Sequence, residues 1–156
     1  MFWTTDRESI VGLGYNRNLI RAADVPKNFT ELAKPEYKGK IAVSGDTTGV
    51  RFIGAMIKAK GEEYIKQLRG LDIQMHMISG GAMHELMAAG EMPMSISIFR
   101  NHVLSGKPKG APTEWMPMDL NPTNAGGVAP PTAANNPYAA LMFIDLSTQS
   151  RRAKDI

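Results

Sequence analysis

The spacing of apolar and polar residues along this chain predicts short strands separated by helices. Apolar and polar residues alternate over 72–78 and again over 94–99, which is the period of a half-buried strand. Apolar runs predict four further strands, at 9–15, 41–43, 113–118 and 127–129. A linker rich in Pro, Asn and Gly is expected over 121–125, between the last two of these strands.

Residues with helical spacing lie between the predicted strands. Val50, Ile53 and Ile57 recur at i, i+3 and i+7, which predicts a helix that buries this stripe and ends near Lys60. A similar pattern begins at Met83 and ends near residue 90, and other helices are predicted at 29–33, 62–69, 101–105 and 138–149. The alternation of strands and helices predicts the α/β class, as a three-layer sandwich with a mixed, largely parallel sheet.

Composition narrows the class of protein. The 156 residues suffice for about one domain with a core of its own. Hydrophobic residues make up 43% and charged residues 21%, which excludes collagen and disordered chains. The chain has no Cys, so thiolate catalysis, a Cys-ligated zinc site and disulfides are excluded. No apolar run approaches the ~18 residues that a membrane-spanning helix needs.

The charge and the first residues bear on partners and location. The formal net charge is +3, and the basic residues are dispersed, so no nucleic-acid partner is expected. The first eight residues lack the basic start and the apolar core of a signal peptide. We therefore expect either that the protein stays inside the cell or that its natural N-terminus lies upstream of this chain.

Two predicted strand-to-helix junctions carry small hydroxyl residues and glycines, Ser-Gly-Asp-Thr-Thr-Gly at 44–49 and Ser-Gly-Gly at 79–81. Free backbone N–H groups and the helix dipole favour an anion at such positions, outside the carboxyl ends of the strands. The ligand-binding residues predicted from the junctions are Thr47, Thr48, Gly49, Ser79, Gly80 and Gly81. Simple capping of the two helices by Thr47 and Ser79 is the alternative.

Arg100 and Asn101 complete the predicted ligand-binding set, because they directly follow the strand at 94–99. An Arg there can hold a carboxylate or oxyanion through two hydrogen bonds, and a solvated surface Arg fits the sequence equally well. The three histidines lack the spacing of a metal site, and His84 is expected on a solvated helix face. We predict no catalytic set, no metal site and no cofactor. Six methionines are expected to pack in the core: Met75, Met77, Met83, Met87, Met92 and Met94.

Eight segments follow one another in a familiar order, among them Asp-Val-Pro-Lys-Asn-Phe-Thr-Glu-Leu at 24–32 and Asn-Pro-Tyr-Ala-Ala-Leu-Met-Phe-Ile-Asp at 136–145. The full set is 14–20, 24–32, 35–42, 79–82, 86–93, 109–115, 126–129 and 136–145. In this order of motifs the chain resembles the periplasmic solute-binding proteins of ABC importers. The resemblance is to the type II fold and to the branch that includes ferric-ion and anion binders.

The resemblance implies two α/β lobes joined by hinge strands, with the ligand trapped in the cleft between them. Residues 9–125 would form the second, C-terminal lobe, and 126–156 a return crossing and a helix that packs on a first lobe outside this chain. In iron-binding relatives, adjacent tyrosines follow the strand that matches 94–99. This chain has Phe99, Arg100 and Asn101 there, which favours an anionic ligand over Fe(III).

The resemblance also implies a role in transport rather than in catalysis. The expected protein is the periplasmic solute-binding component of an ABC transporter, which captures a small anionic or metal-chelate ligand and docks on a membrane permease. An effector-binding module of a transcription regulator, which can share this lobe fold, is the alternative. Two copies of an isolated lobe are also expected to be able to pair through the face left for the other lobe.

Overall fold

The computed structural model describes residues 3–152, in which six strands and six α-helices form. The strands are β1 (Thr4–Asn16), β2 (Ile41–Ser44), β3 (Gln74–His76), β4 (Met94–Phe99), β5 (Thr113–Met116) and β6 (Thr123–Val128). The helices are α1 (Phe29–Leu32), α2 (Thr47–Lys60), α3 (Glu62–Leu68), α4 (Gly80–Ala89), α5 (Arg100–Gly106) and α6 (Pro137–Arg152). The chain divides into two compact units, a sheet unit of residues 10–123 and a terminal unit made of the segments on either side of it.

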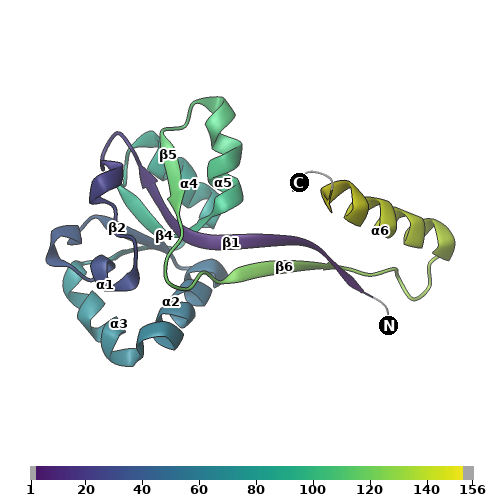
Figure 1. Cartoon of the computed structure of the whole chain (residues 1–156), viewed down its shortest axis with the longest axis horizontal. Helices are drawn as coiled ribbons and strands as arrows, with labels where there is room; N and C mark the ends of the chain where they lie inside the picture. Colours follow the sequence, from purple (N-terminus) through teal and green to yellow (C-terminus); the bar gives the residue numbers. More distant parts are fainter. Residues whose placement is uncertain (1–2, 153–156) are drawn as a thin grey trace. The chain divides into compact units, whose positions relative to one another are not determined.

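The strands form one mixed sheet in the order β3-β2-β4-β1-β5, and β6 pairs with β1 (Figure 1). β2 runs parallel to β3 and to β4, whereas β1 runs antiparallel to β4 and to β5. The parallel strands are joined through helices, as parallel connections require. The predicted α/β class with a mixed sheet is therefore confirmed, and the parallel part of the sheet consists of β3, β2 and β4.

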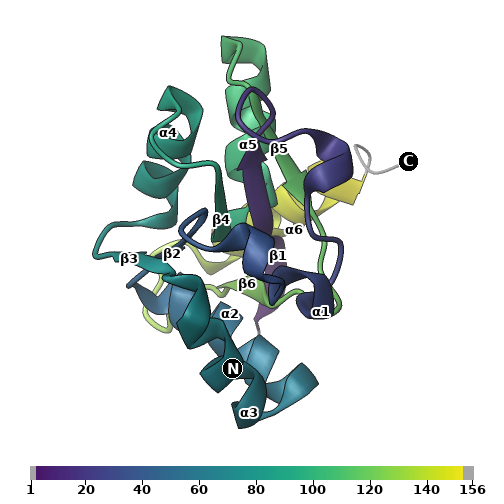
Figure 2. The same ribbon diagram turned by 90° about the vertical axis from the view of Figure 1, so that its left-hand side faces the viewer.

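Two apolar cores fill the sheet unit. The larger one packs α1, α2 and α3 against the sheet, and there the Phe29 and Phe52 rings meet edge to face with their centres 5.9 Å apart. The smaller core packs α4 and α5 against the sheet through Met83, Met87 and Val103. In Figure 2, α4 and α5 lie together and apart from α2 and α3. The helices thus form the two outer layers of the predicted three-layer arrangement.

A bulge in β4 divides its apolar residues between the two cores. Gly12 of β1 pairs with Ile98, whereas Gly14 pairs with Ser95, so β4 has one more residue than β1 over this interval. An extra residue reverses the alternation of side chains across the sheet. Met94 and Ile96 accordingly pack in the larger core and Ile98 in the smaller one. The regular alternation predicted for 94–99 misses this reversal.

The buried face of α2 differs from the predicted stripe. Val50 and Ile57 are 65% and 39% exposed, and only Ile53 of that stripe packs partly against the core. Phe52 and Met56 are buried instead. The prediction was wrong because a longer side chain, that of Phe52, fills the space between α2 and α1 and sets the rotation of the helix.

The predicted core position of the methionines holds for four of the six. Met83, Met87, Met92 and Met94 are buried, whereas Met75 and Met77 are 62% and 80% exposed. The prediction was wrong for these two because Met75 lies in β3, a three-residue strand at the edge of the sheet, and Met77 directly follows that strand.

The terminal unit contains the start of β1, most of β6 and α6. β1 begins at Thr4, five residues before the predicted start, and β6 begins inside the predicted linker. α6 exposes several large apolar side chains: Tyr138, Leu141, Met142, Phe143 and Leu146. Among the residues that the structure describes, no helix is both long enough and apolar enough to span a bilayer. The assignment of 9–125 to the second lobe, and of 126–156 to a return crossing and a helix that packs on a first lobe, stays a prediction.

Candidate functional site

The carboxyl ends of β2, β3 and β4 form one edge of the sheet, which we call the carboxyl edge. The backbone N–H of Ser44 at the end of β2 donates to Ser97 Oγ in β4 at 2.8 Å. The backbone N–H of Gly45 donates to the carbonyl of His76 in β3, also at 2.8 Å. A Cβ added to Gly80 would lie 3.3 Å from the carbonyl oxygen of Ser97. Both predicted junctions therefore meet at the carboxyl edge.

Asp46, and not Thr47, caps the N-terminus of α2. Its Oδ1 accepts from the backbone N–H groups of Thr48 at 2.9 Å and Gly49 at 3.3 Å, and from Ser44 Oγ at 2.8 Å. Burial raises the pKa of Asp46, but the hydrogen bonds from Ser44, Gly49 and Thr48 outweigh burial, so the pKa lies below its ordinary value. The predicted cap at Thr47 is wrong, and a carboxylate already occupies the start of this helix.

The three predicted ligand-binding residues of the first junction differ in accessibility. Thr47 is exposed, whereas Thr48 and Gly49 are buried. A Cβ on Gly49 would overlap the carbonyl oxygen of Ser44, so only glycine fits this close approach of α2 to β2. Gly49 therefore has a structural role, and Thr47 is the residue of this group that a ligand could reach.

Ser79 caps α4, as the alternative interpretation predicted. Its hydroxyl accepts from the backbone N–H of Ala82 at 3.3 Å. The first N–H groups of a helix have no partner inside the helix. In the part of the chain described here, no side chain accepts from Gly80 or Gly81. The start of α4 therefore carries a neutral cap and two glycine amides, one from Gly80, which is buried, and one from Gly81, which is half-buried.

His102 of α5 lies beside the start of α4. Its Cε1 would be 3.7 Å from a Cβ added to Gly80, and its ring centre lies 5.4 Å from that of Phe99. Its Nδ1 is buried without a hydrogen-bond partner in the structure. Burial lowers the pKa of His102, and a backbone contact with Gly80 offsets this only in part. Burial at the carboxyl edge therefore favours the neutral form of the His102 imidazole.

His84 is buried, which contradicts the solvated position predicted for it. Its Nε2 lies 3.0 Å from Thr113 Oγ1, and its ring centre is 6.3 Å from that of His102. Burial and the nearby His102 lower the pKa of His84. Among the described residues, no group of three or more His, Cys, Asp or Glu side chains could hold a metal ion. His84 thus joins α4 to β5 rather than forming a site.

Arg100 and Asn101 begin α5 at the end of β4, and both are exposed. Arg100 lines a cavity of about 250 Å³ between α5 and β5. Trp115 of β5 forms part of the same cavity, and sequence reasoning gave it no role. The sequence of 113–118 predicts only a strand, so nothing in it places an indole beside Arg100.

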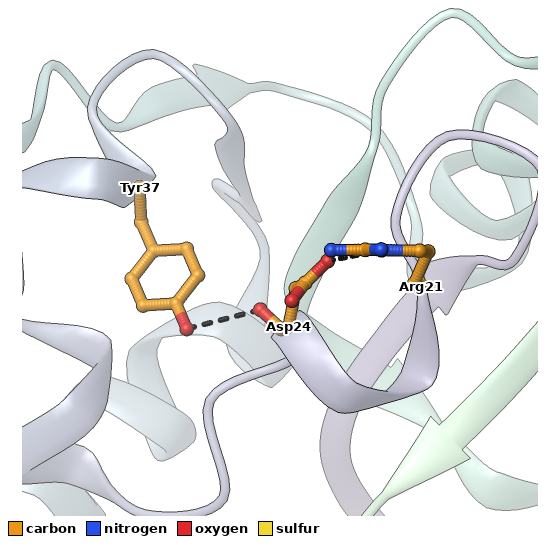
Figure 3. Close-up of polar contacts among 3 residues, drawn as sticks. All are labelled: Arg21, Asp24 and Tyr37. Atoms are coloured by element: carbon orange, nitrogen blue, oxygen red, sulfur yellow. Dashed lines mark hydrogen bonds and ion pairs between the residues drawn. The ribbon is translucent and has the colours of Figure 1, made fainter.

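A second cavity lies at the opposite edge of the sheet, where β1 ends and β2 begins. It has a volume of about 560 Å³ and is lined by charged residues of both signs. Figure 3 shows the brace beside it, in which the Tyr37 hydroxyl donates to the Asp24 carbonyl at 3.0 Å and Arg21 Nε meets Asp24 Oδ2 at 2.7 Å. Arg21 is largely exposed, so this ion pair contributes little stability. The brace joins the turn at 22–24 to Tyr37 within the segment between β1 and β2.

Comparison with known proteins links this architecture to a family. The family described as "Bacterial extracellular solute-binding protein" matches residues 3–137. Comparison with curated protein sequences finds no match. The family match covers the sheet unit and the strand segments of the terminal unit, and it does not extend over α6 beyond its first residue.

Solved structures share the fold at low sequence identity. AfuA from Actinobacillus pleuropneumoniae, solved with fructose-6-phosphate, is 23% identical with a TM-score of 0.69, over 94% of this chain and 49% of that one. Iron-bound HitA from Pseudomonas aeruginosa is 22% identical with a TM-score of 0.68, over 91% and 49%. A substrate-binding protein of an ABC transporter from Agrobacterium tumefaciens is 15% identical with a TM-score of 0.67, over 90% and 45%. The chain spans about half the length of these structures and matches one lobe of a periplasmic-binding-protein fold.

Proposed function

Because this chain belongs to the bacterial extracellular solute-binding protein family, we propose that it forms one lobe of a receptor that delivers a small anionic solute to an ABC importer. The match over residues 3–137 is the observation that carries the receptor role. The family and the structural neighbours are binding proteins, and they give no support to an enzyme or to the effector module of a transcription regulator.

The residues at the carboxyl edge support an anionic ligand. The start of α4 offers the amides of Gly80 and Gly81 beside a neutral cap, and both the helix dipole and these donors favour an anion. Arg100 follows at the next strand and has no ion-pair partner in the part of the chain described. The helix start and the Arg100 guanidinium both favour an anion rather than a bare metal ion. AfuA, a neighbour of the same fold, was solved with a phosphorylated sugar.

The mechanism follows from a two-lobe arrangement. In this proposal, residues 9–125 form the second lobe, and the strands that pass between the sheet unit and the terminal unit act as the hinge. The ligand makes contacts with both lobes only in the closed form, so binding shifts the population toward closure. The closed form then docks on the permease, outside the cytoplasmic membrane in the periplasm. The exposed apolar face of α6 suits packing on the other lobe.

Titration of the 156-residue chain tests the ligand class. Inorganic phosphate at low ionic strength should shift the amide signals of Gly80 and Gly81, and Arg100→Gln should weaken this response about tenfold, because a charge-assisted hydrogen bond is lost. Arg69→Gln is the matched control, since Arg69 lies in a turn that leads into β3 at the opposite edge. Tight ferric-ion binding without any response to small anions would overturn the proposal.

A further inference from the structure

The groove between α5 and β5 indicates more about the chemistry of the ligand than the carboxyl edge does alone. We propose that it binds the apolar part of the solute while Arg100 holds its anionic group, so that the ligand is an organic anion with a flat apolar portion. This inference rests on the proposed function, because it concerns the same ligand. An inorganic oxyanion or a bare metal ion would not fit this proposal, because neither has an apolar part that could bind in the groove.

The groove is built from one face of α5 and one strand edge. One wall consists of three residues of α5, Arg100, Val103 and Leu104, and of Lys107, which directly follows the helix. Glu114 and Trp115 of β5 form the other wall. Both figures of the whole chain show α5 and β5 side by side, and β5 is the last strand of the sheet on this side (Figures 1 and 2). The groove has a volume of about 250 Å³, which is enough for a small ring.

The charges of the groove leave one cation free. Lys107 Nζ lies 2.9 Å from Glu114 Oε2, so these two side chains neutralise each other at one end. Arg100, at the end that adjoins the carboxyl edge, has no ion-pair partner among the described residues. A carboxylate or a phosphoryl group therefore finds its counter-charge at Arg100 and not at Lys107.

The apolar surface of the groove is held in place before any ligand arrives. The Trp115 indole donates from Nε1 to the Ile98 carbonyl at 3.2 Å. A Cβ added to Gly12 would lie 2.6 to 2.8 Å from three indole atoms, so the ring lies directly on the glycine backbone. With its only donor already used, the indole offers apolar surface alone. Leu104, which is 52% exposed, faces the same space.

Together these features favour a solute whose charge and apolar part lie next to each other. Burial of the fixed indole and of the exposed Leu104 under carbon atoms of the ligand lowers the free energy of binding. The indole also loses little conformational entropy when the ligand covers it. Arg100 requires an anionic group at one end of that carbon surface. An inorganic anion would satisfy Arg100 and leave the apolar surface in water.

Two probes that share a head group test the inference. The Trp3→Phe variant of the 156-residue chain makes Trp115 the sole tryptophan, so its fluorescence reports on the groove alone. We expect phenylphosphonate to change the Trp115 emission and to bind roughly tenfold more tightly than inorganic phosphate, because its ring covers apolar surface. Equal affinities, or an unchanged Trp115 emission at saturation, would overturn the groove assignment.

Matched variants separate the charge from the apolar surface. Leu104→Ser should weaken phenylphosphonate about threefold and leave phosphate unchanged, whereas Leu19→Ser, at a similarly exposed leucine of the opposite edge, should alter neither. Arg100→Gln should weaken both probes. If phosphate shifts the Gly80 amide while phenylphosphonate gains nothing from Leu104, the groove inference fails and the proposed function stands. If neither probe shifts any residue, the proposed anion receptor fails with it.

Discussion

The N-termini of α2 and α4 lie at the same edge of the sheet, yet one carries a carboxylate and the other a hydroxyl. Asp46 accepts two backbone hydrogen bonds and two from side chains at the start of α2. Ser79 accepts a single backbone hydrogen bond at the start of α4. Among the described residues, α2 therefore satisfies its own amides with a fixed negative charge, whereas at α4 the amides of buried Gly80 and half-buried Gly81 have no side-chain acceptor.

This difference separates support from binding at the candidate site. A second anion near α2 would be repelled by Asp46, whereas one near α4 would meet the helix dipole without a competing charge. The same type of junction thus braces the fold in one place and is suited to a ligand in the other. Substitutions at the two junctions should therefore affect stability and ligand binding differently.

The largest difference in the free energy of unfolding is expected between alanine substitutions at the glycines of the two junctions. Gly49→Ala should lower the free energy of unfolding by about 3 kcal/mol, because its Cβ would overlap the Ser44 carbonyl oxygen and the backbone would have to shift. Gly80→Ala should change it by less than about 1 kcal/mol, since its nearest atom is 3.3 Å from the new Cβ and alanine favours the helix. Urea unfolding measures both. Equal losses would mean that the two junctions are packed alike.

The second-largest difference in stability is expected between substitutions of the two cap residues. Asp46→Ala should cost about 2 kcal/mol, because four hydrogen bonds to one carboxylate are lost. Ser79→Ala should cost about 0.5–1 kcal/mol for its one long hydrogen bond. Thermal and urea unfolding of the two variants should agree in rank. A larger loss of stability for Ser79→Ala than for Asp46→Ala would mean that the junction at α4, and not the one at α2, supports the fold.

The two caps should also differ in their response to acid. Although burial raises the pKa of Asp46, its hydrogen bonds hold it below the ordinary 3.8. A carboxyl with a lowered pKa stabilises the fold above the unfolded pKa, and the contribution is lost as the pH falls through the folded pKa. The stability gap between wild type and Asp46→Asn should be full at pH 7 and shrink below about pH 4. The gap for Ser79→Ala should stay flat over this range, because a hydroxyl does not titrate there.

The smallest effect concerns an added anion. Phosphate should raise the pKa of His102, which burial lowers, because a negative charge at the start of α4 favours the imidazolium. The Thr48 amide at α2 should not respond in the wild type and should begin to respond in Asp46→Asn, where the repelling charge is gone. NMR titration follows both signals. An equal response of Thr48 and Gly80 in the wild type would contradict the proposed division of roles.

The sequence indicated the fold class and the location of the junctions, because strand and helix periods differ and small residues mark the turns. It could not select the cap of α2, since Asp46, Thr47 and Thr48 are all suitable cap residues and the backbone path decides among them. The bulge in β4 also leaves no mark, because the alternation continues through it. Likewise, the place of Arg100 at the end of a strand is predictable, but its position beside Trp115 depends on how α5 packs on β5.

β1 comes first in the chain and yet lies in the interior of the sheet, between β4 and β5. Its partners Met94 to Phe99 are made roughly eighty residues later, which corresponds to about 5–15 seconds of synthesis. During that interval the apolar segment Val11 to Tyr15 has no strand to pair with, while β2, β3 and β4 can assemble from neighbouring units. β1 therefore stays without its β4 partner until residues 94–99 have been synthesised, and it takes its place between β4 and β5 only after both of these strands have been made.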